Sequence, residues 1–195
     1  MPRIDAHQHF WRYQPRHYPW IDERMRVLRQ DFDPPRLRPL LQEQGFDGAL
    51  AVQARPSEDE TLALLALAEQ GEGVCGVVGW LDIAAPQLAQ RLEVLRPRTA
   101  LRGVRHQVQD EADPAAWLAR PEVERGMQTL QRAGYVYEIL VTHRHLAAAA
   151  AFAARHDEHW LVLDHLGKPD IARGARHWAQ QIRPLAALPH VACKL

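Results

Sequence analysis

Short apolar runs typical of β-strands alternate with longer segments of helical periodicity along most of the chain. The predicted strands are residues 3–7, 48–53, 74–80, 101–106, 135–141, 160–165 and 190–195. The predicted helices are residues 59–70, 85–96, 122–133, 145–155 and 178–188, the last interrupted by Pro184, which is expected to break or kink it. From the third strand on, strands recur roughly every 25 to 35 residues, the spacing of βα units that build a parallel sheet. The pattern therefore predicts an α/β protein with about seven parallel strands.

The first connection, residues 10–44, is longer than the others. Its first part, residues 11–20, is rich in Trp, Tyr and Pro, and the prolines argue against a helix there. In a barrel of βα units such a loop lies at the carboxyl-terminal mouth, where active sites are built. It either walls a pocket or packs as a cover over the barrel end, and the two interpretations are compatible.

Composition narrows the functional classes. The 195 residues contain 24 Lys and Arg and 24 Asp and Glu, so no basic field favours nucleic acid and no polybasic segment favours a membrane surface. No apolar run approaches the ~20 residues that span a bilayer, and the N-terminus lacks an apolar signal core. We therefore expect a cytoplasmic protein of open oligomeric state. Cys75 and Cys193 lie in apolar runs, which predicts buried, unbonded thiols.

Histidines at strand ends are the main candidates for chemistry. His7 and His9 are separated by one residue at the end of the first strand, so both side chains face the same way. Two adjacent imidazoles can bind one divalent metal or hydrogen-bond one substrate carbonyl. His165 ends the sixth strand, directly before the turn-forming residues 166–169. We predict that all three histidines belong to one active site.

Other polar residues follow further strands. Gln53 ends the second strand, Arg105 and His106 end the fourth, and Lys168 follows the sixth. Alternation places Arg102 on the face opposite Arg105. We predict that Gln53, Arg105, His106 and Lys168 bind substrate. Trp80 and Tyr137 are expected either to line the pocket or to pack in the core. Nucleophile elbows, P-loops and dinucleotide fingerprints are absent, which removes several other enzyme classes.

At these residues the sequence resembles the amidohydrolase-related family (amidohydrolase 2), which includes sugar-lactone hydrolases such as L-fuconolactonase and L-rhamnonolactonase and the 2-pyrone-4,6-dicarboxylate lactonase. The matching segments are residues 4–11, 18–20, 52–53, 76–80, 101–106, 163–170 and 193–195. The resemblance implies a (β/α)8 TIM barrel of the metal-dependent hydrolase type, here a single domain over residues 1–195 that lacks the last βα units. It also implies hydrolysis of a small-molecule sugar-acid (aldono) lactone.

The resemblance further implies roles for the strand-end residues. His7, His9 and His165 would polarise the lactone carbonyl, either directly or as ligands of a divalent, zinc-like metal. Some similar lactonases need no metal, so the resemblance leaves open whether the protein uses a metal cofactor. The family supplies an aspartate from the eighth strand, in a Gly-Ser-Asp-Trp-Pro-like segment, and no such segment occurs in these residues. Two alternatives therefore stand beside lactone hydrolysis: a metal-dependent decarboxylase of the same superfamily, and a catalytically inactive fragment.

Overall fold

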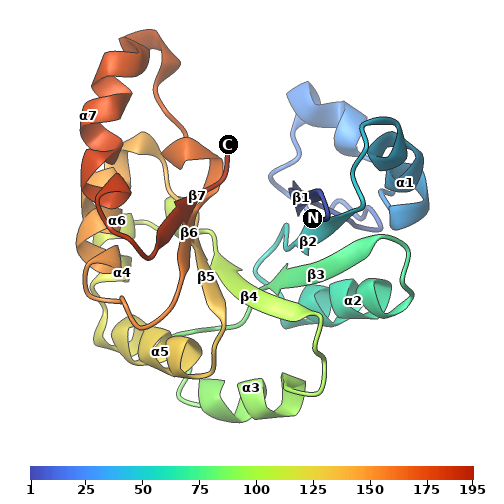
Figure 1. The fold of residues 1–195 in the computed structure, drawn as a ribbon, viewed down its shortest axis with the longest axis horizontal. Coiled ribbons are helices and arrows are strands. Elements are labelled where there is room, and N and C mark those ends of the chain that lie inside the picture. The colour runs from blue at the N-terminus through green and yellow to red at the C-terminus, as the bar shows by residue number, and fades with distance from the viewer. The chain divides into compact units, whose positions relative to one another are not determined.

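The computed structural model describes residues 1–195, whose contacts group into two compact units. Unit 1 comprises residues 1–80 and 98–102, and unit 2 comprises residues 81–97 and 103–195. Strand β4 (Leu101–His106) contributes its first two residues to unit 1 and the rest to unit 2. All seven predicted strands are present (Figure 1).

Unit 1 is built on three parallel strands in the order β1-β2-β3. Its elements are β1 (Ile4–Gln8), the 3-10 helix η1 (Glu23–Leu28), α1 (Pro34–Glu43), β2 (Gly48–Val52), α2 (Glu58–Glu69) and β3 (Val74–Gly79). Helix α2 lies along β3 and buries Leu64 and Leu65 (Figure 1). Thr61 of α2 ties the helix to the strand end, because its hydroxyl accepts from Trp80 N at 2.7 Å and donates to Trp80 O at 2.8 Å.

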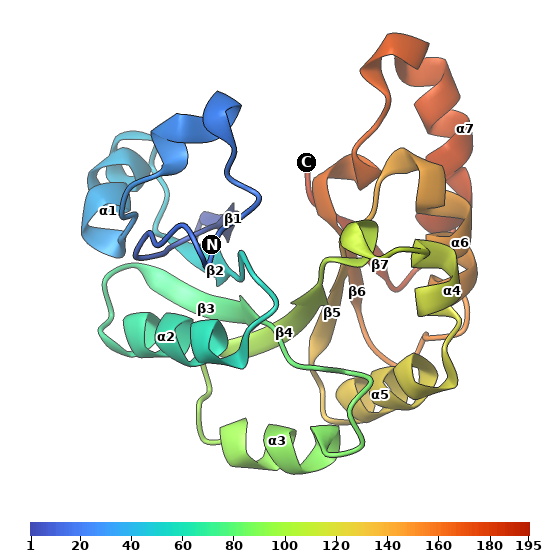
Figure 2. The ribbon, with the colours of Figure 1, turned by 180° about the vertical axis from the view of Figure 1, so that it is seen from behind.

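Unit 2 is built on parallel strands in the order β4-β5-β6-β7. Besides β4, its strands and α-helices are α3 (Leu88–Leu95), α4 (Pro114–Leu118), α5 (Pro121–Arg132), β5 (Val136–Ile139), α6 (Leu146–Ala153), β6 (Leu161–Leu163), α7 (Gly174–Ala186) and β7 (Val191–Cys193). Short 3-10 helices follow the strands: η2 (Val108–Asp110), η3 (His143–His145), η4 (Asp164–Gly167) and η5 (Ile171–Arg173). Helices α6 and α7 lie side by side in both views (Figures 1 and 2).

The helices differ from the sequence prediction at the prolines. Residues 11–20 contain no helix, as predicted, but α1 follows in the same connection and starts with Pro34. Proline fits the first turn because the amide hydrogen it lacks has no partner there, and Asp33 caps the helix by accepting from Arg36 N. Pro184 does not end α7, which continues to Ala186. Proline therefore marks a helix start in one case and is tolerated inside the last turns in the other.

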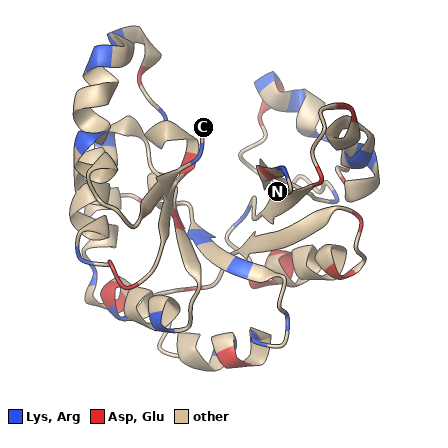
Figure 3. Cartoon of the chain, in the orientation of Figure 1, with Lys and Arg blue, Asp and Glu red and all other residues tan.

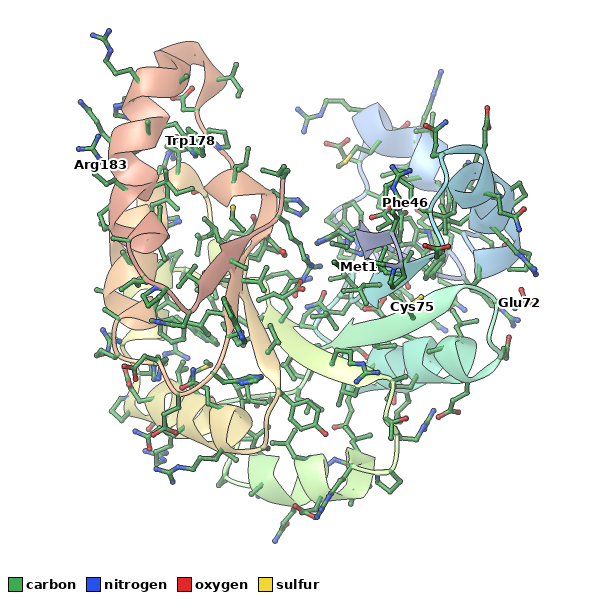
Figure 4. All side chains as sticks on the ribbon, in the orientation of Figure 1. Met1, Phe46, Glu72, Cys75, Trp178 and Arg183 are labelled. Atoms are coloured by element: carbon green, nitrogen blue, oxygen red, sulfur yellow. The ribbon has the colours of Figure 1, made fainter.

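The prediction of buried cysteines was wrong. Cys75 and Cys193 are both exposed, and neither is disulfide-bonded. Cys75 is the one exposed residue of β3 and lies next to the start of the strand, whereas Val77, on the same face, is buried (Figure 4). Cys193 lies in β7, whose last two residues are exposed. An apolar neighbourhood in sequence therefore did not decide the burial of either thiol.

Charges of both signs occur in both units (Figure 3). Strand β4 and helix α7 carry basic residues alone, whereas the chain as a whole has equal numbers of Lys plus Arg and Asp plus Glu. None of the helices has the combination of length and apolar character that crossing a bilayer demands.

Candidate functional site

The end of β1 presents two imidazoles close together. The side chain of Asp5 accepts a hydrogen bond from His7 N at 3.0 Å, and the register with β2 shifts between Asp5 and Gln8. Such irregularities re-aim side chains at strand ends. The rings of His7 and His9 pack edge to face, with centroids 4.8 Å apart. The predicted shared orientation of the two histidines is therefore present.

The hydrogen bonds of His9 determine which of its ring nitrogens has a lone pair available to bind a metal. His9 Nδ1 lies 2.8 Å from Val52 O, and a carbonyl only accepts, so Nδ1 carries the hydrogen and Nε2 keeps its lone pair. His9 Nε2 faces His7 Nε2 at 3.2 Å. Two nitrogens bound to one tetrahedral zinc at about 2.0–2.1 Å would lie about 3.3–3.4 Å apart. The pair thus fits two ligand positions on such an ion, with the Val52 carbonyl orienting one ring.

The long loop of unit 1 both packs and walls a pocket. Trp11 and Tyr18 are buried together with Ile21 and Ala54, and Trp11 Nε1 donates to Gln30 O at 2.9 Å. A pocket of about 450 Å³ lies between residues 10–33 and helix α2. Both interpretations of the aromatic loop therefore hold within this unit.

A buried carboxylate that the sequence analysis missed holds the start of α2 in unit 1. Glu60 Oε2 accepts from Ala54 N at 2.8 Å and Arg55 N at 2.9 Å, and Tyr18 donates to Oε1 at 3.2 Å. Burial raises the pKa of Glu60. Gln53, just before this segment, is also fully buried, and its backbone amide continues the sheet by donating to Val78 O.

Unit 2 carries a buried ionic cluster at its strand ends. Arg105 Nη1 donates to Asp164 Oδ2 at 2.8 Å, and Lys194 Nζ lies 3.5 Å from Asp164 Oδ1 while also pairing with Glu138. Burial, and then the charge of Asp164, raise the pKa of Glu138 to about 7. Arg105 was predicted, whereas Glu138 and Lys194 were missed. Each stands in an apolar strand sequence, which is the signal that could have identified a buried charge.

The chain after β6 adopts a rare backbone conformation. His165, Leu166, Gly167 and Lys168 all have positive φ, between 49° and 68°. For residues other than glycine this region costs about 1–2 kcal/mol each, and such strain concentrates at functional sites. Trp178 of α7 supports the turn by donating from Nε1 to Leu166 O at 2.8 Å (Figure 4). The turn presents the His165 and Lys168 side chains from one short segment.

The predicted basic residues of unit 2 have defined partners. Burial lowers the pKa of His165, and the Asp164 carboxylate partly offsets this. Lys168 Nζ donates to Gln109 Oε1 at 2.6 Å. His106 lies 2.7 Å from Glu111 Oε1 and stacks on Trp117 with ring centroids 4.4 Å apart.

The side chains of Lys168 and His106 are therefore held in place. Their binding of substrate and the catalytic role of His165 stay predictions. The other two aromatic candidates differ in burial. Tyr137 is completely buried and belongs to the core, whereas Trp80 is partly exposed.

Comparison with known proteins decides the family. Residues 4–195 match the amidohydrolase family (Amidohydro_2). This chain belongs to that family. The membership makes the protein a hydrolase, and the family recognised from the sequence is confirmed.

Two curated relatives of this amidohydrolase are L-fucono-1,5-lactonases. The Burkholderia multivorans enzyme is 51% identical, over 99% of this chain and 67% of its own length. The Burkholderia ambifaria enzyme is 37% identical over the same shares. About a third of the length of each relative is therefore not matched by these 195 residues.

Solved structures match this amidohydrolase throughout. A crystal structure of a Burkholderia multivorans amidohydrolase with bound zinc has 50% identity and a TM-score of 0.96, covering 100% of this chain and 69% of that one. A probable 2-pyrone-4,6-dicarboxylic acid hydrolase from Acinetobacter baumannii has 18% identity and a TM-score of 0.79, covering 99% and 69%, and shows the fold alone. The expected barrel class, with seven of its strands, is confirmed.

Proposed function

We propose that this amidohydrolase hydrolyses a sugar-acid lactone of the L-fucono-1,5-lactone kind. The identities of 51% and 37% to two L-fucono-1,5-lactonases support this substrate class. The observation that carries the chemistry is the His7–His9 pair, whose Nε2 atoms face each other at 3.2 Å. Hydrolysis of a lactone needs a group that stabilises negative charge on the carbonyl oxygen, and this pair would supply one by holding a divalent metal at the strand end.

His7, His9 and His165 are the proposed ligands of a zinc ion. The spacing of His7 and His9 fits two such ligands, and the carboxyl ends of barrel strands converge at one mouth, which supports adding His165. The 50% identical relative binds zinc. When bound, zinc polarises a carbonyl and lowers the pKa of a coordinated water.

The residues of the chain divide into binding and positioning groups. Lys168, His106 and Gln53 are proposed to hold the hydroxyls of the lactone. Arg105 is only 3% exposed and is bound to Asp164, so its proposed role is to position that carboxylate beside His165. The group that accepts the proton of the attacking water is expected, by resemblance, from an eighth-strand aspartate outside these residues.

The experiment is a hydrolysis assay on a panel of aldonolactones with a pH indicator. It compares the 195-residue chain with a chimera that adds the unmatched third of the Burkholderia multivorans relative. Activity of either protein on a sugar lactone supports the proposal, and activity of the chimera alone assigns the inactive-fragment alternative to the shorter chain. The absence of hydrolysis by both, on every lactone, would reject it.

Decarboxylation has weaker support. A 2,6-dihydroxybenzoate decarboxylase matches at 11% identity with a TM-score of 0.53, covering 85% of this chain and 67% of that one, which shows the fold alone. Release of carbon dioxide from an aromatic acid, without lactone hydrolysis, would favour this alternative.

A further inference from the structure

Unit 2 contains a candidate binding pocket that the proposed lactone hydrolysis uses only in part. A pocket of about 670 Å³ lies between the segments 142–145, which follow β5, and 168–172, which follow β6, with Gln109 also in its lining. Its volume is within the roughly 300–1,000 Å³ typical of small-molecule sites. The two walls come from consecutive strand-to-helix connections, which in this fold class are the segments that vary to bind ligands.

Hydrogen bonds hold the two walls together. His143 N and Nδ1 lie 3.4 and 3.1 Å from Lys168 O, and both must donate because a carbonyl oxygen only accepts. Gln181 of α7 donates to His143 O at 3.4 Å. On the first wall, Thr142 Oγ1 and His145 Nδ1 lie 3.2 Å apart. Hydrogen bonds therefore join the two walls of this open pocket.

More basic than acidic side chains line the pocket. The basic lining residues are His143, Arg144, His145 and Lys168. Asp170 is the acidic one, and its carboxylate already accepts from Ala172 N at 3.2 Å and pairs with Arg173 at 3.4 Å. The ammonium group of Lys168 bonds to an amide oxygen, which carries no formal charge.

We propose that this pocket binds the oxyanion group of a small ligand, with Arg144 and Lys168 as the cations that recognise it. A planar guanidinium matches two oxygens of a carboxylate or phosphate, and the lysine adds a point charge. The Thr142 hydroxyl and the His145 imidazole add hydrogen-bonding groups on the same wall. Two sources share this chemistry: the carboxylate of a ring-opened sugar acid, a source that rests on the proposed function, and a phosphate group.

Isothermal titration calorimetry on the full chain tests the proposal. The ligands are sodium D-gluconate, inorganic phosphate, and sorbitol as a neutral six-carbon control. The variants are Arg144→Gln, Lys168→Gln and the matched control Arg176→Gln, an exposed arginine of α7 outside the lining. We expect an anion to bind and sorbitol not to bind. Arg144→Gln should weaken the anion about tenfold or more, as expected for loss of a charged hydrogen bond, and Arg176→Gln should not.

The outcomes distinguish a sugar acid from a phosphorylated ligand, and they distinguish this anion-site proposal from the lactonase proposal. Binding of gluconate but not phosphate identifies the sugar acid as the source, and the reverse identifies a phosphorylated ligand. Failure of both anions to bind, or equal affinities in Arg144→Gln and Arg176→Gln, would overturn the proposal. Circular dichroism shows whether Lys168→Gln is folded. If it is not, the comparison of Arg144→Gln with Arg176→Gln tests the proposal. A chain that binds an anion through Arg144 but hydrolyses no lactone keeps this site and rejects only the lactonase proposal.

Discussion

Arg105 on β4 donates to Asp164, after β6, at 2.8 Å, and the two side chains retain only 3% and 0% of their exposure. Strand β5 lies between β4 and β6 in the sheet, and its residue Glu138 is in register with Arg105. The pair therefore spans three strands inside unit 2. A buried ion pair is sensitive to loss of one partner, because the other charge then stays buried with less compensation.

Removing the arginine alone should destabilise the protein strongly. For Arg105→Met we expect the free energy of unfolding to fall by about 3–5 kcal/mol, since the buried Asp164 loses its 2.8 Å partner. The double variant Arg105→Met with Asp164→Leu should recover most of this loss. Urea denaturation followed by circular dichroism measures both. Equal stabilities for the single and double variants would contradict a coupled buried pair.

The histidine pair predicts how zinc binding responds to mutation. His9→Gln removes a proposed ligand, so zinc affinity should fall by more than the roughly 10- to 100-fold typical of losing an outer hydrogen-bond partner. His177→Gln is the control, because this histidine lies on α7 and contacts only Arg173 at 3.5 Å. Competition with a chromophoric chelator measures the affinity. An unchanged affinity in His9→Gln would remove His9 from the ligand set.

Alanine substitutions at two glycines with positive φ distinguish the cost of steric crowding from the cost of backbone strain. A Cβ on Gly167 (φ 68°) would lie 2.5 Å from a methyl group of Leu146, whereas one on Gly134 (φ 79°) would meet open space. Gly134→Ala should cost about 1–2 kcal/mol from the backbone alone. Gly167→Ala should cost more, by about 1–3 kcal/mol, because the buried Leu146 must move. Thermal unfolding of both variants gives the difference, and equal losses would show that Leu146 adapts freely.

Glu138 predicts a pH-dependent stability difference. Its pKa rises from the ordinary 4.5 to about 7, chiefly through burial. Between these values the folded chain keeps a proton that the unfolded chain has lost, so this group reduces stability as pH increases. Glu138→Gln lacks this titration, so its stability relative to the parent should improve from pH 5 to pH 8, by up to about 3 kcal/mol. Denaturation curves at both pH values test it, and a difference of opposite sign would contradict the raised pKa.

The sequence predicted the strands well because alternation and spacing are local properties. Strand β4 begins and ends at the predicted residues, and the other strands differ by one or a few positions. Helix α1 was not predicted, although its two initial prolines occupy first-turn positions where proline is compatible with a helix. The exposure of Cys75 could not be predicted, because an apolar run does not reveal where along the strand burial begins.

The sequence marked candidate site residues by their position, but it did not predict their partners. His7 lies near the end of β1, and His9 and Lys168 follow strands. The burial of Arg105 against Asp164 joins residues 59 positions apart, a pairing that local sequence does not encode. The left-handed turn at 165–168 was also hidden, because only Gly167 has the residue type that favours it.

The two exposed thiols have a practical consequence. Cys75 lies in unit 1 and Cys193 in unit 2, and the sequence contains no other cysteine. The native protein therefore carries one attachment point for a spectroscopic label in each unit, without any engineered residue. Burial raises the pKa of Cys193, so its reactive thiolate forms less readily at a given pH. A donor and an acceptor dye placed in this way would report the separation of the two units during metal or ligand titrations.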